Sequence, residues 1–436
     1  MYFSNINTIY IYCNKSSNRL TYCLNTLFTE GLGINYKLIL DLELFKNTQG
    51  VKLNYSEIII ENCLQIKPHT ILFDYGIKDY LVEVNTHAQF EKIFFKTSNL
   101  LIPFDLFGAM FWLLSRYEEY LPHKIDKHNR FNFKSSLAYQ YNFIDKPLVN
   151  KWIDELKTLL LNINSTLEFK PKTYTFLSSI DIDNVFKYKY KGFVRTLAGY
   201  LSDLIVKNFK SIHERTKVIL KKSADPFDCY SFLIDTHNDL NINSIYFFLL
   251  GDYGVNDKNH SATNLNFQTL IKSIADYSMV GIHPSYGSRE NLQQLKIEIN
   301  RLSTITHKNI RKSRQHFSVL NFPNTYKMLL QAGIVEDYSM GYTNYNGFRA
   351  SYCYAYNWYN LDDEQITPLI IYPFCIAENT LIYYADKENK TLLELAKPLI
   401  EEVKKYNGQL ISIFHNDTFN QKIKDFYVEF LKNCKV

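Results

Sequence analysis

Apolar residues recur along the first part of the chain in patterns that predict both strands and helices. The strand-like apolar runs, which are separated by turn residues, are 8–12, 36–40, 57–60 and 70–73. Apolar side chains then recur at helical spacing over 105–120 and again over 147–161. These patterns predict a smaller N-terminal α/β domain over residues 1–165.

Strand-like and helix-like segments alternate from Pro171 to the end of the chain. The apolar runs of this part are 176–180, 244–250, 278–282 and 410–414. Such alternation is typical of βα units built around parallel strands, and it predicts a second domain over 166–436. A long polar and basic stretch, at about 188–240, separates the first two runs, and we interpret it as a helical insertion.

Charge and cysteine content exclude several classes of protein. The 436 residues include 49 Lys and Arg and 44 Asp and Glu, which gives a formal net charge of +5. Basic residues are interspersed with acidic and aromatic ones and form no long block, so we expect no nucleic-acid partner. The seven cysteines form no Cys-x-x-Cys pair, which argues against a zinc ribbon and against a disulfide framework.

The longest apolar run, 106–114, is well short of the ~20 residues that a membrane-spanning helix needs. Residues 1–7 lack the basic start and long apolar stretch of a secretory signal. We therefore expect a cytoplasmic protein with no membrane span.

Two carboxylates, Asp181 and Asp183, follow the first strand of the second domain. Side chains at i and i+2 leave a strand on the same side, so one carboxylate can hold a metal while the other transfers a proton. His283 and His415 come at the ends of two later strands. Because the carboxyl ends of parallel strands converge in a barrel, these residues predict one active site.

Each of these polar residues also has a structural interpretation. Asp183 taken alone is as consistent with a helix N-cap as with a ligand. Arg314 and Arg349 can pair with acids such as Asp337, and His260 lies in a polar segment that we expect to be exposed. The succession of polar clusters at strand ends favours the catalytic interpretation.

Five short motifs carry a resemblance to a known family. They are Asp-x-Asp at 181–183, Gly-Ile-His-Pro-Ser-Tyr at 281–286, Ser-Arg-Gln-His at 313–316, Asp-Tyr-Ser-Met-Gly-Tyr at 337–342 and Gly-Phe-Arg-Ala at 347–350. In these motifs the chain resembles the polysaccharide deacetylases, the family 4 carbohydrate esterases related to nodulation-factor deacetylases, and within them a divergent bacterial branch. The resemblance implies a distorted (β/α) barrel over 166–436. Segments 103–107 and 114–122 resemble the N-terminal domain of unknown function that accompanies this branch.

The resemblance also implies roles for individual residues. Asp181 matches the catalytic base, Asp183 and His283 match metal ligands, and His415 matches the histidine that protonates the leaving amine. Arg314 falls in the third motif, which lines the catalytic groove and supplies a backbone N–H to the oxyanion. The implied activity is metal-dependent hydrolysis of acetyl groups on a carbohydrate, at carbon–nitrogen but not peptide bonds.

Further residues of the matching motifs are expected to contact the acetylated carbohydrate substrate. These residues are Tyr286, Asp337 and Arg349.

The chain departs from the family pattern at one ligand position. Four residues after His283, where the family has its second metal histidine, the chain has Gly287. Catalytic zinc usually has three protein ligands, so Asp183 and His283 alone are an incomplete set for a divalent metal, of which zinc is the expected one. His316 is the favoured replacement because it lies at another strand end and imidazole suits zinc, and His260 is the alternative.

Two other functions stay open. A catalytically weakened relative would bind a carbohydrate or a partner through the same cleft, with tyrosines and Trp358 as stacking platforms. An unrelated metal-dependent amidohydrolase would be expected to show a His-x-His pair after its first strand, where this chain has Asp-x-Asp.

Overall fold

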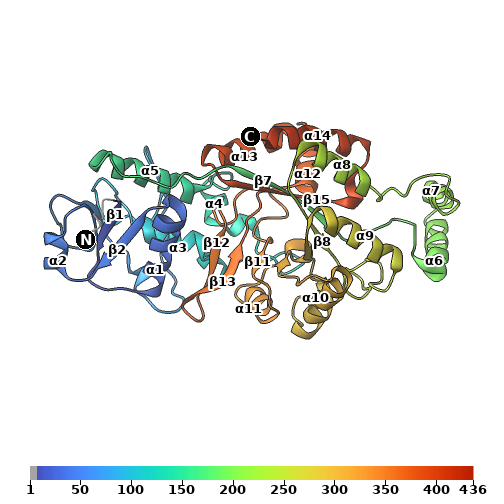
Figure 1. The fold of residues 1–436 in the computed structure, drawn as a ribbon, viewed down its shortest axis with the longest axis horizontal. Coiled ribbons are helices and arrows are strands. Elements are labelled where there is room, and N and C mark those ends of the chain that lie inside the picture. Colours follow the sequence, from blue (N-terminus) through green and yellow to red (C-terminus); the bar gives the residue numbers. More distant parts are fainter. Residues whose placement is uncertain (1–6, 436) are drawn as a thin grey trace.

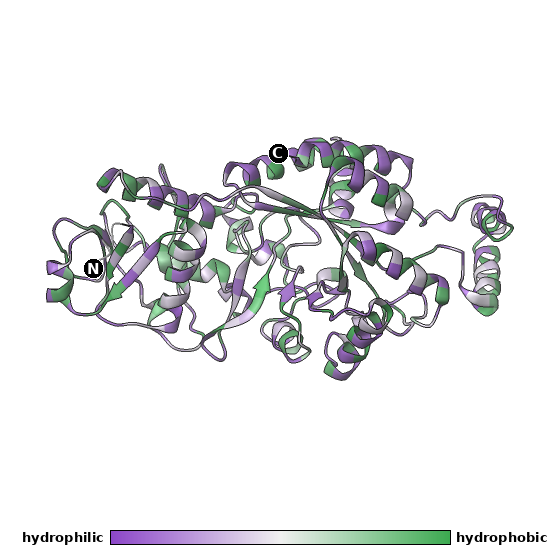
Figure 2. Ribbon diagram, viewed as in Figure 1, coloured by the Kyte–Doolittle hydropathy of each residue, from purple (hydrophilic) through white to green (hydrophobic). Residues whose placement is uncertain are grey.

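The computed structural model describes residues 7–435 and shows an elongated molecule (Figure 1), in which a four-stranded sheet, a nine-stranded sheet and a two-stranded pair are formed. The N-terminal region lies at one end, the large C-terminal sheet lies in the middle, and a pair of helices projects at the other end. In Figure 2 most helices contain both hydrophobic and hydrophilic residues, as expected for elements that bury one face. No helix in the described range is long and apolar enough to cross a membrane.

The N-terminal sheet has four parallel strands in the order β2-β1-β3-β4. In this order, the strands are β2 (Asn35–Ile39), β1 (Thr8–Tyr12), β3 (Val51–Tyr55) and β4 (Leu64–Ile66). Small helices and an antiparallel pair complete this part: α1 (Asn18–Leu24), α2 (Leu42–Asn47), α4 (Leu137–Gln140), β5 (Asn85–His87) and β6 (Glu91–Ile93).

Two of the four strands predicted in this region are wrong. Residues 57–60 form a loop after β3, where Ile58 and Ile59 are exposed and the Asn54 side chain donates to the Ile58 carbonyl at 2.7 Å. Residues 70–72 form one 3₁₀ turn instead of a strand. An apolar run becomes a strand only where a neighbouring strand can pair with it, and neither segment has such a neighbour among the described residues.

The two predicted helices of this region are present with altered bounds. Helix α3 (Leu106–Leu114) is buried along its whole length, and Asp105 caps it by accepting from the Gly108 amide at 2.9 Å. It ends earlier than predicted because Arg116 has a left-handed backbone with φ of 56°. Helix α5 (Leu148–Ile163) matches the prediction closely.

The C-terminal sheet has nine strands, and only the β12–β13 pair is antiparallel. In spatial order the strands are β12 (Tyr356–Asn360), β13 (Gln365–Ile371), β11 (Glu336–Asp337), β10 (Lys312–Ser313), β9 (Met279–Ile282), β8 (Ser244–Phe248), β7 (Thr175–Ile182), β15 (Gln409–His415) and β14 (Ile376–Ala377). Within residues 7–435 no pairing joins the outer strands β12 and β14. The observed fold is therefore mixed α/β with a large, mostly parallel sheet, and closure into a barrel stays a prediction.

Helices pack against the C-terminal sheet and connect its strands. They are α9 (Leu265–Tyr277), α10 (Leu292–Thr306), α11 (Asn324–Gln331), α12 (Glu378–Glu388), α13 (Leu392–Lys405) and α14 (Gln421–Cys434). Helices α13 and α14 lie along one side of β7 and β15 (Figure 1). Because β15, β7, β8, β9 and β10 pair in parallel, their carboxyl ends lie along one edge of the sheet.

Three helices occupy the segment that we interpreted as an insertion. They are α6 (Gly192–Ile205), α7 (Phe209–Ile219) and α8 (Tyr230–Leu240). Helix α8 packs on α14 and buries Tyr230, Leu233 and His237, so it belongs to the layer that covers the sheet. Helices α6 and α7 project from the rest of the molecule (Figure 1), so the protruding part of the segment is shorter than predicted.

Buried ion pairs join the N-terminal region to the C-terminal sheet. Glu119 accepts hydrogen bonds from Arg116 Nε at 2.8 Å and from Arg349 Nε at 2.9 Å. Arg19 forms an ion pair with Glu364. All of these arginines are buried, so the two regions share one packed interface.

Candidate metal and catalytic site

The residues predicted for the site lie at neighbouring strand ends. Asp181 pairs with His415 in the register of β7 and β15, and Ile282 pairs with Ser313 in the register of β9 and β10. Strand β8 lies between β7 and β9, and Asp257 of the loop after it contacts His316. The topology therefore brings together side chains that are up to 234 residues apart in the chain.

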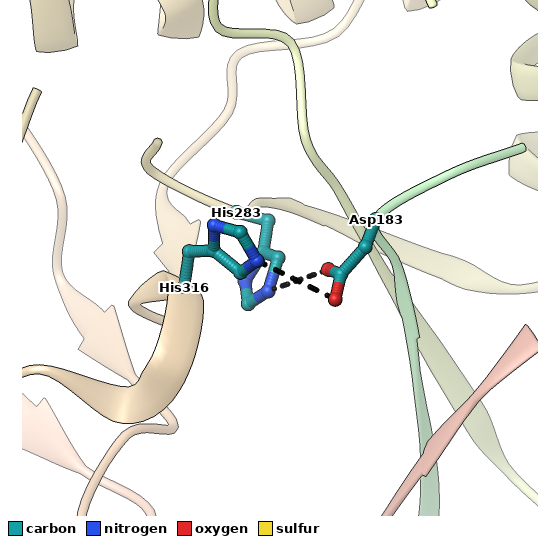
Figure 3. A group of neighbouring side chains, drawn as sticks. All are labelled: Asp183, His283 and His316. Atoms are coloured by element: carbon teal, nitrogen blue, oxygen red, sulfur yellow. Dashed lines mark ion pairs between the residues drawn. The ribbon is translucent and has the colours of Figure 1, made fainter. Parts of the chain in front are cut away.

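Asp183, His283 and His316 form a compact cluster whose ligand atoms all lie within 4.8 Å of one another (Figure 3). His283 Nε2 is 3.1 Å from Asp183 Oδ1, and His316 Nε2 is 3.4 Å from Asp183 Oδ2. His283 follows β9, while His316 begins the turn after β10. The two imidazoles thus come from successive strand ends, and Gly287 adds no side-chain donor to the cluster.

Hydrogen bonds fix which nitrogen of each histidine faces Asp183. His283 Nδ1 lies 2.5 Å from the Arg314 carbonyl oxygen, and His316 Nδ1 lies 3.0 Å from Asp257 Oδ1. Both partners are acceptors, so each Nδ1 carries a proton, and Nε2 is the nitrogen of each ring that can offer a lone pair to a cation. Two lone pairs and a carboxylate then converge on one point.

This donor set fits a divalent cation. Asp183 Oδ1 and His283 Nε2 are buried and have no hydrogen-bond partner, although they lie next to each other. Two imidazoles and one carboxylate are a common three-ligand set for catalytic zinc. Burial lowers the pKa of His316, but the Asp183 charge outweighs it and raises that pKa to about 9. His316 therefore holds a proton at neutral pH unless a cation takes its place.

Asp257, in the loop after β8, supports the cluster and was not predicted. Its Oδ1 accepts from the Tyr286 amide at 2.9 Å, and its Oδ2 accepts from the Gly287 amide at 3.1 Å, in addition to the contact with His316. Burial works against the ionised form, yet these hydrogen bonds keep the pKa of Asp257 below its ordinary value. The Asp257 carboxylate thus connects His316 to the turn that contains Tyr286 and Gly287.

Asp181 lies between the cluster and His415. Its Oδ1 is 3.0 Å from Arg314 Nη1, and its Oδ2 is 3.9 Å from His283 Nε2 and 4.0 Å from His415 Nε2. Arg314 is fully buried and is held by the Tyr338 carbonyl at 2.9 Å and by Ser179 Oγ at 2.5 Å. Arg314 thus holds the Asp181 carboxylate in a fixed position between the cluster and His415, where a carboxylate can accept a proton.

His415 is oriented by Glu378, a second residue that was not predicted. Glu378 Oε1 accepts from His415 Nδ1 at 2.6 Å and from the His415 backbone amide at 3.0 Å. Burial lowers the pKa of His415, but the Glu378 carboxylate raises it well above its ordinary value. His415 is therefore protonated at neutral pH, with Nε2 directed toward Asp181 and able to donate.

Two of the three predicted substrate contacts face the protein interior. Asp337 is fully buried and accepts from Ser313 at 2.8 Å and from Ser339 at 2.9 Å, because its strand lies inside the sheet. Arg349 is buried against Glu119 at the interface between the two regions. We no longer propose either residue as a substrate contact, whereas Tyr286 is partly exposed beside Phe317.

Three other expectations need correction. His260 is buried, with Nε2 3.0 Å from the Lys189 carbonyl, so it is neither exposed nor part of the cluster. Trp358 is buried and offers no stacking platform. The backbone amides of Arg314 and His316 donate to the carbonyls of Ile282 and Pro284, so they are not free to bind an oxyanion.

A hollow of about 510 Å³ opens onto Asp181, Asp183, His316 and His415. The N-terminal region forms part of its wall through the segment 127–130. Arg130 Nη1 donates to the Phe317 carbonyl at 2.9 Å, and the Phe317 ring stacks on His316 at 4.2 Å. The N-terminal region therefore supports the backbone next to one residue of the cluster.

A second cavity of about 1090 Å³ adjoins this hollow and shares Thr343, Asn344 and Asn379 with it. Phe133 and Tyr139 line it from the N-terminal region, and Tyr345 and Tyr384 line it from the other side. Phe133 and Tyr345 stack at 5.1 Å. The two spaces together form a groove, which we call the aromatic groove, whose walls come from both regions.

Residues 9–165 match the model of a family of unknown function, DUF7033. No curated protein matches the sequence.

Among solved structures, the chain is similar to a protein assigned as a polysaccharide deacetylase from Mycobacterium smegmatis, at 12% identity and a TM-score of 0.37. It is also similar to a polysaccharide deacetylase from Bacillus cereus, at 11% identity and a TM-score of 0.29. Each match covers 60% of this chain and 86% of the other. A mutant of a CE4 family pseudoenzyme with restored enzymatic activity matches at 10% identity and a TM-score of 0.28, over 61% of this chain and 64% of that one. Similarities of this size are too weak to assign the chain to that family.

Proposed function

We propose that the protein is a metal-dependent hydrolase that removes acetyl groups from a carbohydrate. The observation that carries this proposal is that two acids, two residues apart, have different neighbouring side chains. Asp183 faces the Nε2 atoms of two imidazoles, as a ligand would, while Asp181 faces a guanidinium and a protonated histidine, as a proton-transfer group would. A deacetylase of this type needs both functions within one hollow.

Asp183, His283 and His316 would hold the divalent cation. When bound, such a cation polarises an acyl carbonyl and makes a water molecule more acidic. Asp181, which Arg314 holds in place, accepts the proton of the attacking water. The water oxygen forms a bond to the acyl carbon, the carbon–nitrogen bond breaks, and His415 gives its proton to the leaving amine. Acetate and a free amino sugar are the products.

The aromatic groove supports an oligosaccharide as the substrate class. At about 1090 Å³, its outer cavity is as large as a typical site for a whole small-molecule ligand, and it continues into the hollow. Aromatic rings can pack against the apolar faces of sugar rings, while Asn344 and Asn379 can hydrogen-bond to sugar hydroxyls. The groove accounts for a sugar chain that extends beyond the acetylated unit. We propose that the sheet curls around this groove as the distorted barrel of the resembling family.

A cytoplasmic location is the associated proposal. All seven cysteines, which lie within residues 7–435, are unpaired, and six of them are buried. Free thiols are typical of a reducing compartment.

Acetate release tests the proposed function directly. Protein loaded with zinc, cobalt or manganese is incubated with N-acetylated and O-acetylated oligosaccharides of two to six units. We expect release by the native protein and none by Asp181→Asn, which should retain its metal. Tight binding of an oligosaccharide without acetate release, with every metal, would instead support the carbohydrate-binding alternative, which the glycine at position 287 also favours.

A further inference from the structure

The α6–α7 hairpin, residues 192–219, exposes a continuous apolar face. No residue of α6 is buried, and Phe193, Val194 and Ile205 are 81%, 78% and 80% exposed. The exposed large apolar residues of this helix are Phe193, Val194, Leu197, Leu201, Leu204 and Ile205. Their spacing places them within one face of the helix. This face has no partner within the described chain.

The contact between α6 and α7 is polar, the reverse of an ordinary helical hairpin in water. Arg215 of α7 pairs with Asp203 of α6 at 2.7 Å, and Tyr200 hydrogen-bonds Thr216 at 2.9 Å. Gly199 lets the guanidinium approach, because a Cβ at this position would overlap with Arg215. Polar groups thus hold the two helices together while the apolar face points outward.

The apolar face continues around the tip of the hairpin. Val206 and Phe209, at the turn between the helices, are 67% and 64% exposed. Lys207 and Lys210 alternate with them along the chain. The tip therefore presents apolar and basic side chains together.

Positive charge is concentrated in the same segment. The hairpin, residues 192–219, contains five Lys and Arg and two Asp and Glu, and the flanking residues 187–191 and 220–222 add five more Lys, although the whole chain has a net charge of only +5. The remainder of the chain therefore has a small net negative charge. The excess of basic residues therefore lies in the hairpin and at its base.

We propose that the α6–α7 hairpin docks onto a negatively charged lipid membrane, with its apolar face inserted at the interface. Interfacial helices combine an apolar face with Lys and Arg, and each basic residue near an anionic bilayer adds to the attraction. A protein partner would account for the apolar face but not for the excess positive charge. A nucleic acid would account for the charge but not for the apolar face.

The base of the hairpin is firmly attached next to the candidate site. Asp225 accepts from the amides of Lys187 and Tyr188, both at 2.8 Å, and Arg195 donates to the Asn259 carbonyl at 3.2 Å. The hairpin begins nine residues after Asp183, on the sheet edge that carries the site. Docking would hold that edge near the bilayer. If the proposed hydrolase function also holds, the substrate class is a membrane-associated glycan.

Vesicle co-sedimentation of the full chain tests the docking. We expect binding to vesicles of phosphatidylcholine with 30% phosphatidylglycerol, weaker binding at high salt, and little binding to phosphatidylcholine alone. Ile205→Ser and Phe209→Ser should each weaken binding at least about tenfold, because each removes a large apolar side chain from the interface. Lys207→Gln and Lys210→Gln should each weaken binding about fivefold, and only on the anionic vesicles.

Ile59→Ser and Leu81→Ser, at exposed positions of the N-terminal region, are the matched controls and should bind like the native protein. The proposal is overturned if native protein does not bind anionic vesicles or if the hairpin variants bind equally well. It is also overturned if sedimentation equilibrium without lipid shows a dimer that Phe209→Ser dissociates. Acetate release from soluble oligosaccharides, measured in parallel, reports the hydrolase proposal separately, since the hairpin variants keep the whole site.

Discussion

Two buried charge clusters in this protein differ in what faces their carboxylates. At the interface between the two regions, Glu119 accepts hydrogen bonds from Arg116 and Arg349, whose guanidinium groups keep their charge at any ordinary pH. Burial raises the pKa of Glu119, but the two arginines outweigh it and hold the pKa below the ordinary value. In the site, Asp183 faces only imidazole nitrogens.

This difference separates a structural cluster from a functional one. The interface cluster is complete without any added group, because every charge has a permanent partner. The cluster of Asp183, His283 and His316 is complete only with protons or a cation, so its state depends on pH and on metal. Burial of charge alone would not have distinguished the two.

The largest expected effect is on stability, at the interface cluster. Glu119→Gln should lower the free energy of unfolding by about 3–5 kcal/mol, because it leaves the buried Arg349 without its carboxylate and leaves Arg116 paired with Glu118 alone. Urea denaturation measures the change, and zinc bound per folded chain should stay the same. Asp183→Asn is the matched comparison: it should remove the metal and destabilise the metal-free protein much less. Equal losses of stability in the two variants would show that the clusters do not differ as described.

A smaller effect is expected at Asp257, which touches the metal cluster without belonging to it. Asp257→Asn should weaken zinc binding about 10- to 100-fold, because the carboxylate fixes the proton and the orientation of His316. Chelator competition measures the affinity. Asp252→Asn, in the same loop but exposed beside Arg301, should bind zinc like the native protein. Equal zinc affinities for Asp257→Asn and the native protein would show that Asp257 does not orient His316 for metal binding.

A pH effect is expected from the pair of Glu378 and His415. Glu378 raises the pKa of His415, so the pair stabilises the fold fully below the ordinary histidine pKa, and this contribution is lost as the pH rises through the raised value. The same upward shift of the pKa keeps His415, the proposed acid, protonated. Glu378→Gln should therefore move the basic limb of the kcat profile to lower pH. Glu388→Gln, at the other end of α12, is the control. An unmoved basic limb would contradict the role of His415 as the acid.

The smallest effect is expected in the aromatic groove. Tyr345→Ala should raise KM for oligosaccharides of four or more units by about two- to tenfold, since one stacking surface is lost. KM for a disaccharide should change little, because Tyr345 lines the outer cavity. Tyr277→Ala, an exposed tyrosine on α9, should leave both values unchanged. A uniform rise in KM for all lengths would argue against an extended groove.

The sequence predicted the parts of the fold that depend on local pattern. Strands β7, β8, β9 and β15 lie where apolar runs ended in polar residues, and those ends meet at one edge. The runs at 57–60 and 70–73 failed because an apolar run does not reveal whether a neighbouring strand is available. The barrel and the domain limits remain predictions.

The supporting residues of the site could not be predicted for a related reason. Asp257 lies 59 residues from His316, and Glu378 lies 37 residues from His415, so only the topology brings each pair together. The polar loop at 256–260 contains both Asp257 and His260, and its sequence does not show which of them faces the site. Asp337 and Arg349 look like site residues in the sequence because burial against internal partners leaves no local pattern.

The central claim is that His316 completes a three-residue metal site in place of the histidine missing at position 287. Zinc titration of metal-free protein, followed by elemental analysis, tests it most directly. The account predicts one equivalent of zinc in the native protein and in His260→Ala, and none in Asp183→Ala, His283→Ala or His316→Ala. A native protein that binds no zinc, or a His316→Ala variant that binds it with native affinity, would contradict the account.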